Sequence, residues 1–402
     1  MAVRARREPA SYLGVTLSSK LFTPVTIPAP QGEGLTVRNR AFVAPMCQYS
    51  VVAEDGVPTD WHLVHLGAMA SGGFGLVTVE ATGVEARGRI SPRDLGLYTD
   101  EQMQAHARIV DFIHAQGAAA GIQLGHAGGK ASTYPGVPGA SDGTVPAAEG
   151  GWETVGPVSE PVFPHLASAN ALDADGITQV IEAFAHAAQL ADQAGYDIIQ
   201  LHGAHGYLIH QFLSPLTNKR TDDYGGSEEG RTRLVREIAR AVRAVWPAHK
   251  PLGLRLSATD WVEGGWDVEA SARLVKDLVA EYGVNWVDIS SGGLTNGSSI
   301  PVGTAYQAPL AAAITNAVAE LGAAGAGGGA GGARAGSRAV VSAVGLIEDA
   351  KTAESLLVTG QADAISIGRA ALRNPHWATA AAAELRVARE DLPRSTQYWR
   401  AW

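Results

Sequence analysis

The chain has 402 residues, of which 46% are hydrophobic and 18% charged, and its formal net charge is −9. This composition is ordinary for a folded protein with a substantial core, and the acidic balance without basic runs argues against nucleic-acid or anionic-membrane partners. No apolar stretch is long enough to span a bilayer, and the basic start is not followed by the apolar core of a secretory signal. We therefore expect a cytoplasmic protein.

The chain contains a single cysteine, Cys47. One cysteine excludes an intramolecular disulfide and a multi-cysteine zinc site. A lone cysteine is ordinarily a small buried hydrophobic residue, so a functional role for Cys47 depends on its neighbours.

Apolar strand-like runs alternate with amphipathic helical stretches along nearly the whole chain. Strands are predicted at 41–45, 75–80, 119–124, 197–201, 252–256, 286–290, 339–344 and 363–367. Helices are predicted at 101–116, 177–194, 231–245, 268–281, 309–321, 349–358 and 376–386. Eight β/α units in order predict an α/β fold, a (β/α)8 TIM barrel. We expect one barrel domain over 21–402, after an N-terminal extension of residues 1–20.

Two segments stand outside this alternation. Residues 132–170 form a long Pro/Gly-rich stretch after the third strand, which we expect to cap the barrel mouth. Residues 322–337 are a Gly/Ala-rich insertion that we expect to be flexible and to lie on the opposite face. No Lys-Ser/Thr pair follows its glycines, so the pattern does not favour a phosphate-binding loop there.

The fourth predicted strand leads directly into His202-Gly203-Ala204-His205-Gly206-Tyr207. In a parallel barrel, side chains at this end of a strand project into the ligand-binding mouth. Two imidazoles can polarise a carbonyl oxygen while a phenol protonates a carbon beside it, which indicates chemistry on an activated double bond. A zinc site is an alternative, but no third ligand has suitable spacing. A second alternative is that both histidines are ordinary core residues, but this does not explain why both follow a strand into the mouth.

The ends of the seventh and eighth strands carry Gly345, Gly368 and Arg369. Glycines there let backbone N–H groups approach an anion, and an arginine adds a bidentate donor, so these residues indicate a phosphate site. Tight turns alone would explain the glycines but not Arg369. Gln123 and Arg255 add donors from the opposite wall that suit a flat heterocycle, and FMN fits the set. Taken singly, Arg255 could instead pair with an aspartate such as Asp260 or Asp288.

The sequence resembles the old yellow enzyme family, and within it the class of thermophilic ene-reductases and xenobiotic reductase A. The resemblance runs from about Leu21 to the C-terminus. It is carried by Pro45-Met46-Cys47-Gln48-Tyr49-Ser50, the histidine and tyrosine segment above, Phe212-Leu213-Ser214-Pro215-Leu216-Thr217-Asn218, Arg220-Thr221-Asp222-Asp223-Tyr224-Gly225-Gly226-Ser227, and Gln397-Tyr398-Trp399-Arg400-Ala401-Trp402.

The resemblance implies an FMN-dependent NAD(P)H oxidoreductase that reduces the C=C bond of α,β-unsaturated carbonyl or nitro compounds. It implies that His202 and His205 bind the activating group and that Tyr207 donates the proton. It implies that Cys47 lies by the flavin and tunes its potential. The residues it assigns to FMN are Ala44, Pro45, Met46, Cys47, Ala81, Gln123, Arg255, Ser291, Gly345, Gly368 and Arg369.

The resemblance also implies a substrate pocket shared between subunits. Tyr49 would line it, Arg400 would reach it from a neighbouring subunit, and Trp402 would help to shape it. A homodimer or homotetramer is expected on this ground.

Two other functions stay open from the residues alone. A lyase- or aldolase-like barrel could use the same phosphate corner, but no strand end carries a clear Schiff-base lysine. A flavin-binding or storage protein would hold FMN without turning it over with NAD(P)H.

Overall fold

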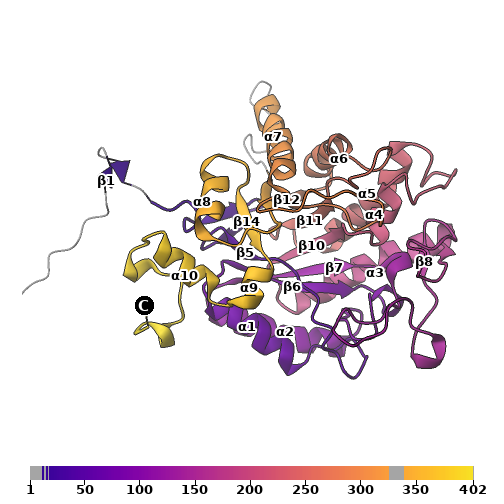
Figure 1. Ribbon diagram of the computed structural model, residues 1–402, viewed down its shortest axis with the longest axis horizontal. Helices are drawn as coiled ribbons and strands as arrows, with labels where there is room; N and C mark the ends of the chain where they lie inside the picture. The colour runs from indigo at the N-terminus through magenta and orange to yellow at the C-terminus, as the bar shows by residue number, and fades with distance from the viewer. Residues whose placement is uncertain (1–10, 13–14, 17, 326–338, 402) are drawn as a thin grey trace, which may run out of the picture.

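The computed structural model describes residues 11–12, 15–16, 18–325 and 339–401. Its centre is a closed barrel of eight parallel strands in the order β10-β11-β12-β13-β14-β5-β6-β7 (Figure 1). In chain order these strands are β5 (Ala41–Val43), β6 (Leu76–Gly83), β7 (Ala119–Gly125), β10 (Ile198–Gly203), β11 (Leu252–Ser257), β12 (Val284–Ser290), β13 (Val340–Ala343) and β14 (Ala364–Ile367). The predicted TIM barrel is confirmed.

Helices follow the strands and surround the barrel (Figure 1). They are α1 (Asp60–Ser71), α2 (Asp100–Ala115), α3 (Ala174–Gln193), α4 (Leu208–Leu213), α5 (Glu228–Val245), α6 (Val268–Glu281), α7 (Ala308–Gly325), α8 (Ala350–Val358), α9 (Arg369–Arg373) and α10 (Trp377–Glu384). Side-chain caps fix several of their first turns: Asp173 accepts from the Gly176 N–H at 2.8 Å and Ser227 from the Gly230 N–H at 3.0 Å. None of the helices in the described ranges is long and apolar enough to cross a membrane.

One end of the barrel is closed by a short hairpin, β3 (Val25–Ile27) with β4 (Leu35–Val37). Its apolar side chains join a buried cluster with residues from the first positions of the strands, including Phe42 and Trp286. The rings of Phe42 and Trp286 meet edge to face, 5.9 Å apart. Because this end is filled with side chains, a ligand can enter only at the other end, where the strands finish.

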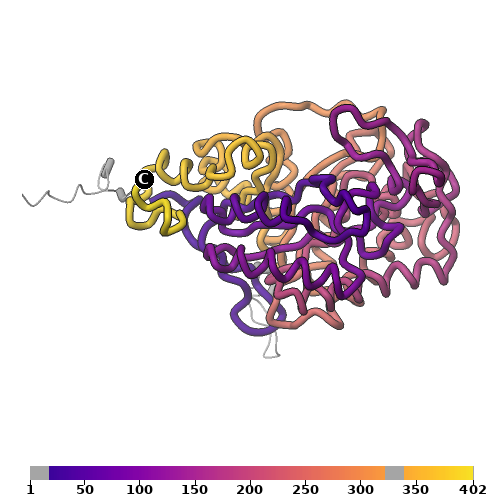
Figure 2. Tube along the Cα trace, turned by 90° about the horizontal axis from the view of Figure 1, so that it is seen from below, coloured from indigo at the N-terminus to yellow at the C-terminus, as the bar shows by residue number. Residues whose placement is uncertain are grey.

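The segment after β7 and the C-terminal tail lie far apart. Residues 132–170 include a two-stranded parallel sheet, β8 (Val155–Gly156) with β9 (Asn170–Ala171). Figures 1 and 2 place this segment and the C-terminus at opposite ends of the molecule. The tail is held there by Ser395, whose hydroxyl donates to Gln116 Oε1 at 2.7 Å beyond the end of α2.

The structure differs from the predicted elements in a few places. Helices α1, α4 and α9 were not among the predicted helices. The prediction that the helix at 309–321 ends at residue 321 is wrong, because this helix, α7, continues through Gly325 and so takes in the first residues of the expected insertion. The rest of that insertion, 326–337, lies outside the described residues.

Candidate active site

The two histidines and the tyrosine predicted after the fourth strand meet at the open end of the barrel. The ring of His202 lies 5.2 Å from that of His205 and 4.9 Å from that of Tyr207, edge to face in both cases. His202 belongs to β10, whereas Tyr207 caps the start of α4. His205 has a φ of 58°, which turns the chain sharply between them.

Hydrogen bonds from neighbouring strand ends fix this turn. The His205 backbone N–H donates to Ser257 Oγ at 3.0 Å, and His205 Nε2 lies 2.7 Å from Ser290 Oγ. The Gly206 N–H donates to His210 Nδ1 at 2.9 Å, and His210 Nε2 lies 2.9 Å from Asp260 Oδ1. The turn is therefore held from β10, β11 and β12 at once.

The protonation of the three groups follows from their burial. Burial, followed by the positive charge of Arg255, holds the pKa values of His202 and His205 well below the ordinary value. Burial raises the pKa of the Tyr207 phenol well above its ordinary value. At neutral pH the site therefore presents two neutral imidazoles and one protonated phenol.

Lys130, from the turn after β7, adds a cation to this site. Its Nζ donates to the carbonyl oxygens of His205 at 2.7 Å and Gly293 at 3.0 Å. It also lies 4.9 Å from the ring centre of Tyr207. Burial lowers the pKa of Lys130 to about 8. Lys130 was not among the predicted site residues, although it lies five residues beyond the end of β7, a position that could have indicated it.

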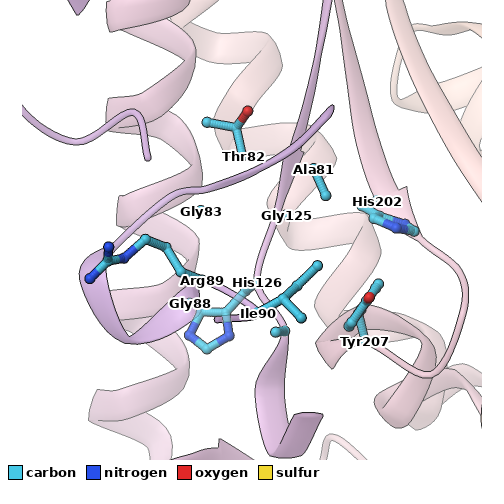
Figure 3. A pocket seen from close by; sticks show the side chains of 11 residues that line it. Ala81, Thr82, Gly83, Gly88, Arg89, Ile90, Gly125, His126, His202 and Tyr207 are labelled. Atoms are coloured by element: carbon cyan, nitrogen blue, oxygen red, sulfur yellow. The ribbon is translucent and has the colours of Figure 1, made fainter. Parts of the chain in front are cut away.

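A small pocket of about 10 Å³ opens beside His202 and Tyr207. Figure 3 shows these two side chains next to each other, with Ala81 nearby and Arg89 directed away on the other side. Ile90 and His126 also line the pocket. His126 Nδ1 accepts from the Gly128 N–H at 2.9 Å, so its Nε2 proton faces Glu85 Oε1 at 2.8 Å.

A second cavity, of about 170 Å³, lies at the ends of β13 and β14. The predicted phosphate-binding residues Gly345, Gly368 and Arg369 line it together with Arg255. Gly345 has a φ of 116°, and a Cβ there would lie 2.6 Å from Gln307 Nε2. Ser290, the partner of His205, lines the same cavity, so the two pockets are neighbours across the mouth.

The other predicted cofactor residues lie around these pockets, with some donors already in use. Gln123 Nε2 donates to Gln200 Oε1 at 2.7 Å, and Ser291 Oγ donates to Gln307 Oε1 at 2.6 Å. Arg255 Nε lies 3.2 Å from Asp288 Oδ2, one of the two ion pairs considered from the sequence. The loop after β5 reaches the cavity, since a Cβ on Gly368 would lie 3.7 Å from Met46 Sδ.

Two polar atoms in the barrel indicate room for a ligand. Gln200 Nε2 and His202 Nδ1 are buried, and neither has a hydrogen-bond partner within the described part of the chain. Buried polar atoms are rarely left without a partner, so these are suited to a bound polar group. Across the described ranges, no group of three His, Cys, Asp or Glu side chains is arranged to hold a metal ion.

The C-terminal residues stand apart from the site of their own chain. Arg400 is exposed in the C-terminal tail, and this tail lies at the end of the molecule away from β8 (Figure 1). Trp399 beside it is 51% exposed. Trp402, predicted to shape the substrate pocket, lies outside the described residues.

Comparison with known proteins gives the family. The model of the NADH:flavin oxidoreductase / NADH oxidase family matches residues 20–387. An NADPH dehydrogenase from Listeria monocytogenes is 41% identical over 384 residues, which cover 96% of this chain and 99% of the relative. An NADH:flavin oxidoreductase from Gibberella zeae is 41% identical over 398 residues, covering 95% of this chain and 89% of the relative.

Solved structures share the barrel. Morphinone reductase superposes with a TM-score of 0.69 at 24% identity, over 95% of this chain and 90% of that one, which supports the fold. A 2-naphthoyl-CoA reductase gives a TM-score of 0.74 at 25% identity over 89% of this chain, which spans only 51% of that protein. Taken with the extent of the family match, these similarities show that the chain belongs to the old yellow enzyme family of FMN-dependent NADH:flavin oxidoreductases.

Proposed function

We propose that this protein is an ene-reductase, which uses NADPH or NADH to reduce the C=C bond of α,β-unsaturated carbonyl or nitro compounds. The observation that carries the proposal is the cluster of His202, His205 and Tyr207, whose rings lie within 5.2 Å of their neighbours. Two hydrogen-bond donors beside one proton donor match a substrate that carries an electron-withdrawing oxygen next to a reactive double bond. The names of the NADPH dehydrogenase relatives support NADPH as the donor.

FMN fits the residues that line the mouth. Gly345, Gly368 and Arg369 would hold its phosphate in the cavity of about 170 Å³. Arg255 would stabilise negative charge on the ring, and the loop Ala44–Cys47 with Ala81, Gln123 and Ser291 would surround the remainder. The chemistry that FMN would supply here is the transfer of a hydride from the nicotinamide to the substrate.

The protein side chains would bind and protonate the substrate. His202 and His205 would donate hydrogen bonds to its carbonyl or nitro oxygen, and their neutral state leaves one N–H on each ring. Tyr207 would give its phenolic proton to the α-carbon. A positioned general acid contributes roughly 10²–10⁴-fold to a rate. Burial of the phenol keeps that proton in place until the substrate carbon takes it.

The loop after β5 would serve both ligands. Cys47 would lie beside the flavin and tune its potential, while Tyr49 would line the substrate pocket. Tyr49 has a φ of 51°, so the backbone turns directly after Cys47 and Gln48. Burial raises the pKa of Tyr49, so its phenol is protonated at neutral pH.

We further propose a homodimer or homotetramer in the cytoplasm, in which Arg400 and Trp402 reach the active site of a neighbouring subunit. Within one chain the tail lies away from α4, the helix that Tyr207 precedes (Figure 1). Arg400 can therefore act on substrate only if another subunit brings it to the mouth. Residues 132–170 would cap that mouth.

Anaerobic stopped-flow spectroscopy tests the proposal. The purified protein is first reduced with NADPH and then mixed with 2-cyclohexenone. We expect the flavin absorbance to bleach in the first step and to return in the second. Bleaching without return would remove this enone as a substrate and leave a flavin reductase. A bound flavin that NADPH does not bleach would instead support a storage role.

A further inference from the structure

Asp288 is a carboxylate on β12 whose side chain is completely buried. Removing a carboxylate from water is costly unless other polar groups replace the water. The strand register places Arg255 of β11 on one side of Asp288 and Ser342 of β13 on the other. Ser366 of β14 lies two residues beyond Ala364, which is paired with Ser342. Four neighbouring strands of the barrel therefore contribute polar side chains to one buried cluster.

One oxygen of Asp288 is held by two hydroxyl groups. Ser342 Oγ donates to Oδ1 at 2.6 Å, and Ser366 Oγ donates to the same atom at 2.7 Å. Trp286 Nε1 donates to Ser342 Oγ at 2.8 Å, and because an indole N–H can only donate, the Ser342 proton is left for Asp288. These contacts fix Oδ1 as the acceptor for β13 and β14 and turn Oδ2 toward β11.

The other oxygen of Asp288 faces Arg255. Arg255 Nε lies 3.2 Å from Asp288 Oδ2, an ion pair without the alignment of a hydrogen bond. Within the described ranges, no second acidic side chain pairs with Arg255, and its terminal nitrogens Nη1 and Nη2 form no hydrogen bond. The Arg255 side chain lines the cavity of about 170 Å³. Arg255 is thus held at its Nε edge, and its terminal nitrogens are left for a ligand.

The charge of this pair matters for a flavin in the cavity. A guanidinium beside a flavin ring stabilises the negative charge that the ring gains on reduction. The Asp288 carboxylate, 3.2 Å from Arg255 Nε, offsets part of that positive charge. Both side chains are buried, so salt and water screen the effect little.

We propose that Asp288 is a positioning residue that acts on the flavin through Arg255: it holds the guanidinium at the cavity and, by offsetting its charge, lowers the flavin midpoint potential. The inference rests on the proposed place of Arg255 beside the flavin ring. Asp288 itself is not among the residues that line the cavity. It sets how readily the bound flavin accepts electrons without touching the cofactor or the substrate.

Asp288→Asn removes the charge and keeps the shape of the side chain. The two serine hydroxyls still require an oxygen, so the new NH2 group faces Arg255 Nε and the arginine charge is no longer offset. We expect the midpoint potential of bound FMN to become more positive. At the wild-type midpoint, the ratio of reduced to oxidised flavin should rise about tenfold, which is about 30 mV for a two-electron couple. Reductive titration with dithionite beside a reference dye measures this shift.

Ser366→Ala tests the same cluster with the carboxylate kept. Loss of one hydroxyl donor leaves more negative charge on Asp288 to offset Arg255, so we expect the potential to shift the other way. The ratio of reduced to oxidised flavin at the wild-type midpoint should fall about threefold. This variant removes a single oxygen atom, so it decides the question if Asp288→Asn fails to hold FMN. General damage to the cavity would not give shifts of opposite sign.

Asp277→Asn is the matched control, because Asp277 of α6 forms an ion pair with Arg236 Nη2 at 2.6 Å outside the barrel. Its potential should equal that of the wild type. A ratio for Asp288→Asn within about twofold of this control would overturn the proposal, and so would a Ser366→Ala potential equal to or more positive than that of the control. The titration uses neither NADPH nor an alkene, so failure of either half-reaction in the wild type would count against the ene-reductase alone.

Discussion

The Lys130 ammonium lies 4.9 Å from the ring centre of Tyr207 and donates to the carbonyl oxygen of His205 at 2.7 Å. One side chain thus contacts both the proposed proton donor and the backbone of a proposed substrate-binding histidine. The contact with Tyr207 is favourable only while Lys130 is charged. The positions of Tyr207 and His205 therefore depend on whether Lys130 is protonated.

We expect Lys130→Met to slow alkene reduction by about tenfold. We also expect the variant to lack the fall in rate that the wild type shows at high pH. Because the pKa of Lys130 is lowered to about 8, the wild-type lysine loses its charge as the pH rises through that value. The wild-type rate constant for flavin reoxidation by 2-cyclohexenone should then fall above pH 8, whereas that of the variant should not. Stopped-flow mixing from pH 6 to 10 measures both. Lys219→Met, at an exposed lysine, should retain the wild-type profile.

We expect Tyr207→Phe to reduce the rate of alkene reduction roughly 10²–10⁴-fold, because it removes the proposed general acid. The rate of flavin reduction by NADPH should stay close to that of the wild type, since no proton from Tyr207 is needed there. Stopped-flow spectroscopy separates the two half-reactions. Tyr282→Phe, on the outer side of the barrel after α6, serves as the control. Equal losses in both half-reactions would contradict the assigned role.

The barrel could be predicted because its strands are short, continuous apolar runs. Each predicted strand overlaps a strand of the barrel, and the residues that follow β10, β13 and β14 lie at one open end, as the parallel topology requires. Helix α1 was missed for a physical reason: its first turn exposes Trp61, its next exposes Val64, and it buries His62. That pattern does not resemble an amphipathic helix.

The parts of the site that were missed depend on pairing and packing. Lys130 contacts Tyr207 because the turn after β7 packs against α4. That relationship cannot be obtained from spacing along the chain.

We expect Gly345→Ala to weaken FMN binding at least tenfold. An alanine Cβ would lie 2.6 Å from Gln307 Nε2, and the φ of 116° is unfavourable for any residue with a side chain. The displaced Gln307 would disturb Ser291, to which it is hydrogen-bonded in the same part of the mouth. Fluorescence titration of the apoprotein with FMN measures the dissociation constant. Gly360→Ala also has a positive φ, but no atom lies near its Cβ, so unchanged FMN affinity is expected there.

Because of Glu85, the free energy of unfolding of the protein should depend on pH in the acidic range. Burial opposes its ionisation, but hydrogen bonds from His126 and Arg87 outweigh this effect and lower the pKa of Glu85 to about 2. A carboxylate with a lowered pKa stabilises the folded state above its unfolded pKa of about 4.3, and this contribution is lost as the pH falls toward 2. We expect Glu85→Gln to reduce the free energy of unfolding at pH 6 by roughly 1–2 kcal/mol, allowing for solvent screening of a partly exposed group.

The difference in the free energy of unfolding between the wild type and Glu85→Gln should therefore shrink as the pH is lowered from 4.5 to about 2. Urea unfolding of both proteins at a series of pH values measures it. Glu101→Gln, at an exposed position of α2, should follow the wild type throughout. Because Glu85 holds His126 at 2.8 Å and His126 lines the pocket beside Tyr207, the variant should also raise the KM for the enone. A constant stability difference at every pH would mean that Glu85 acts through packing and not through its charge.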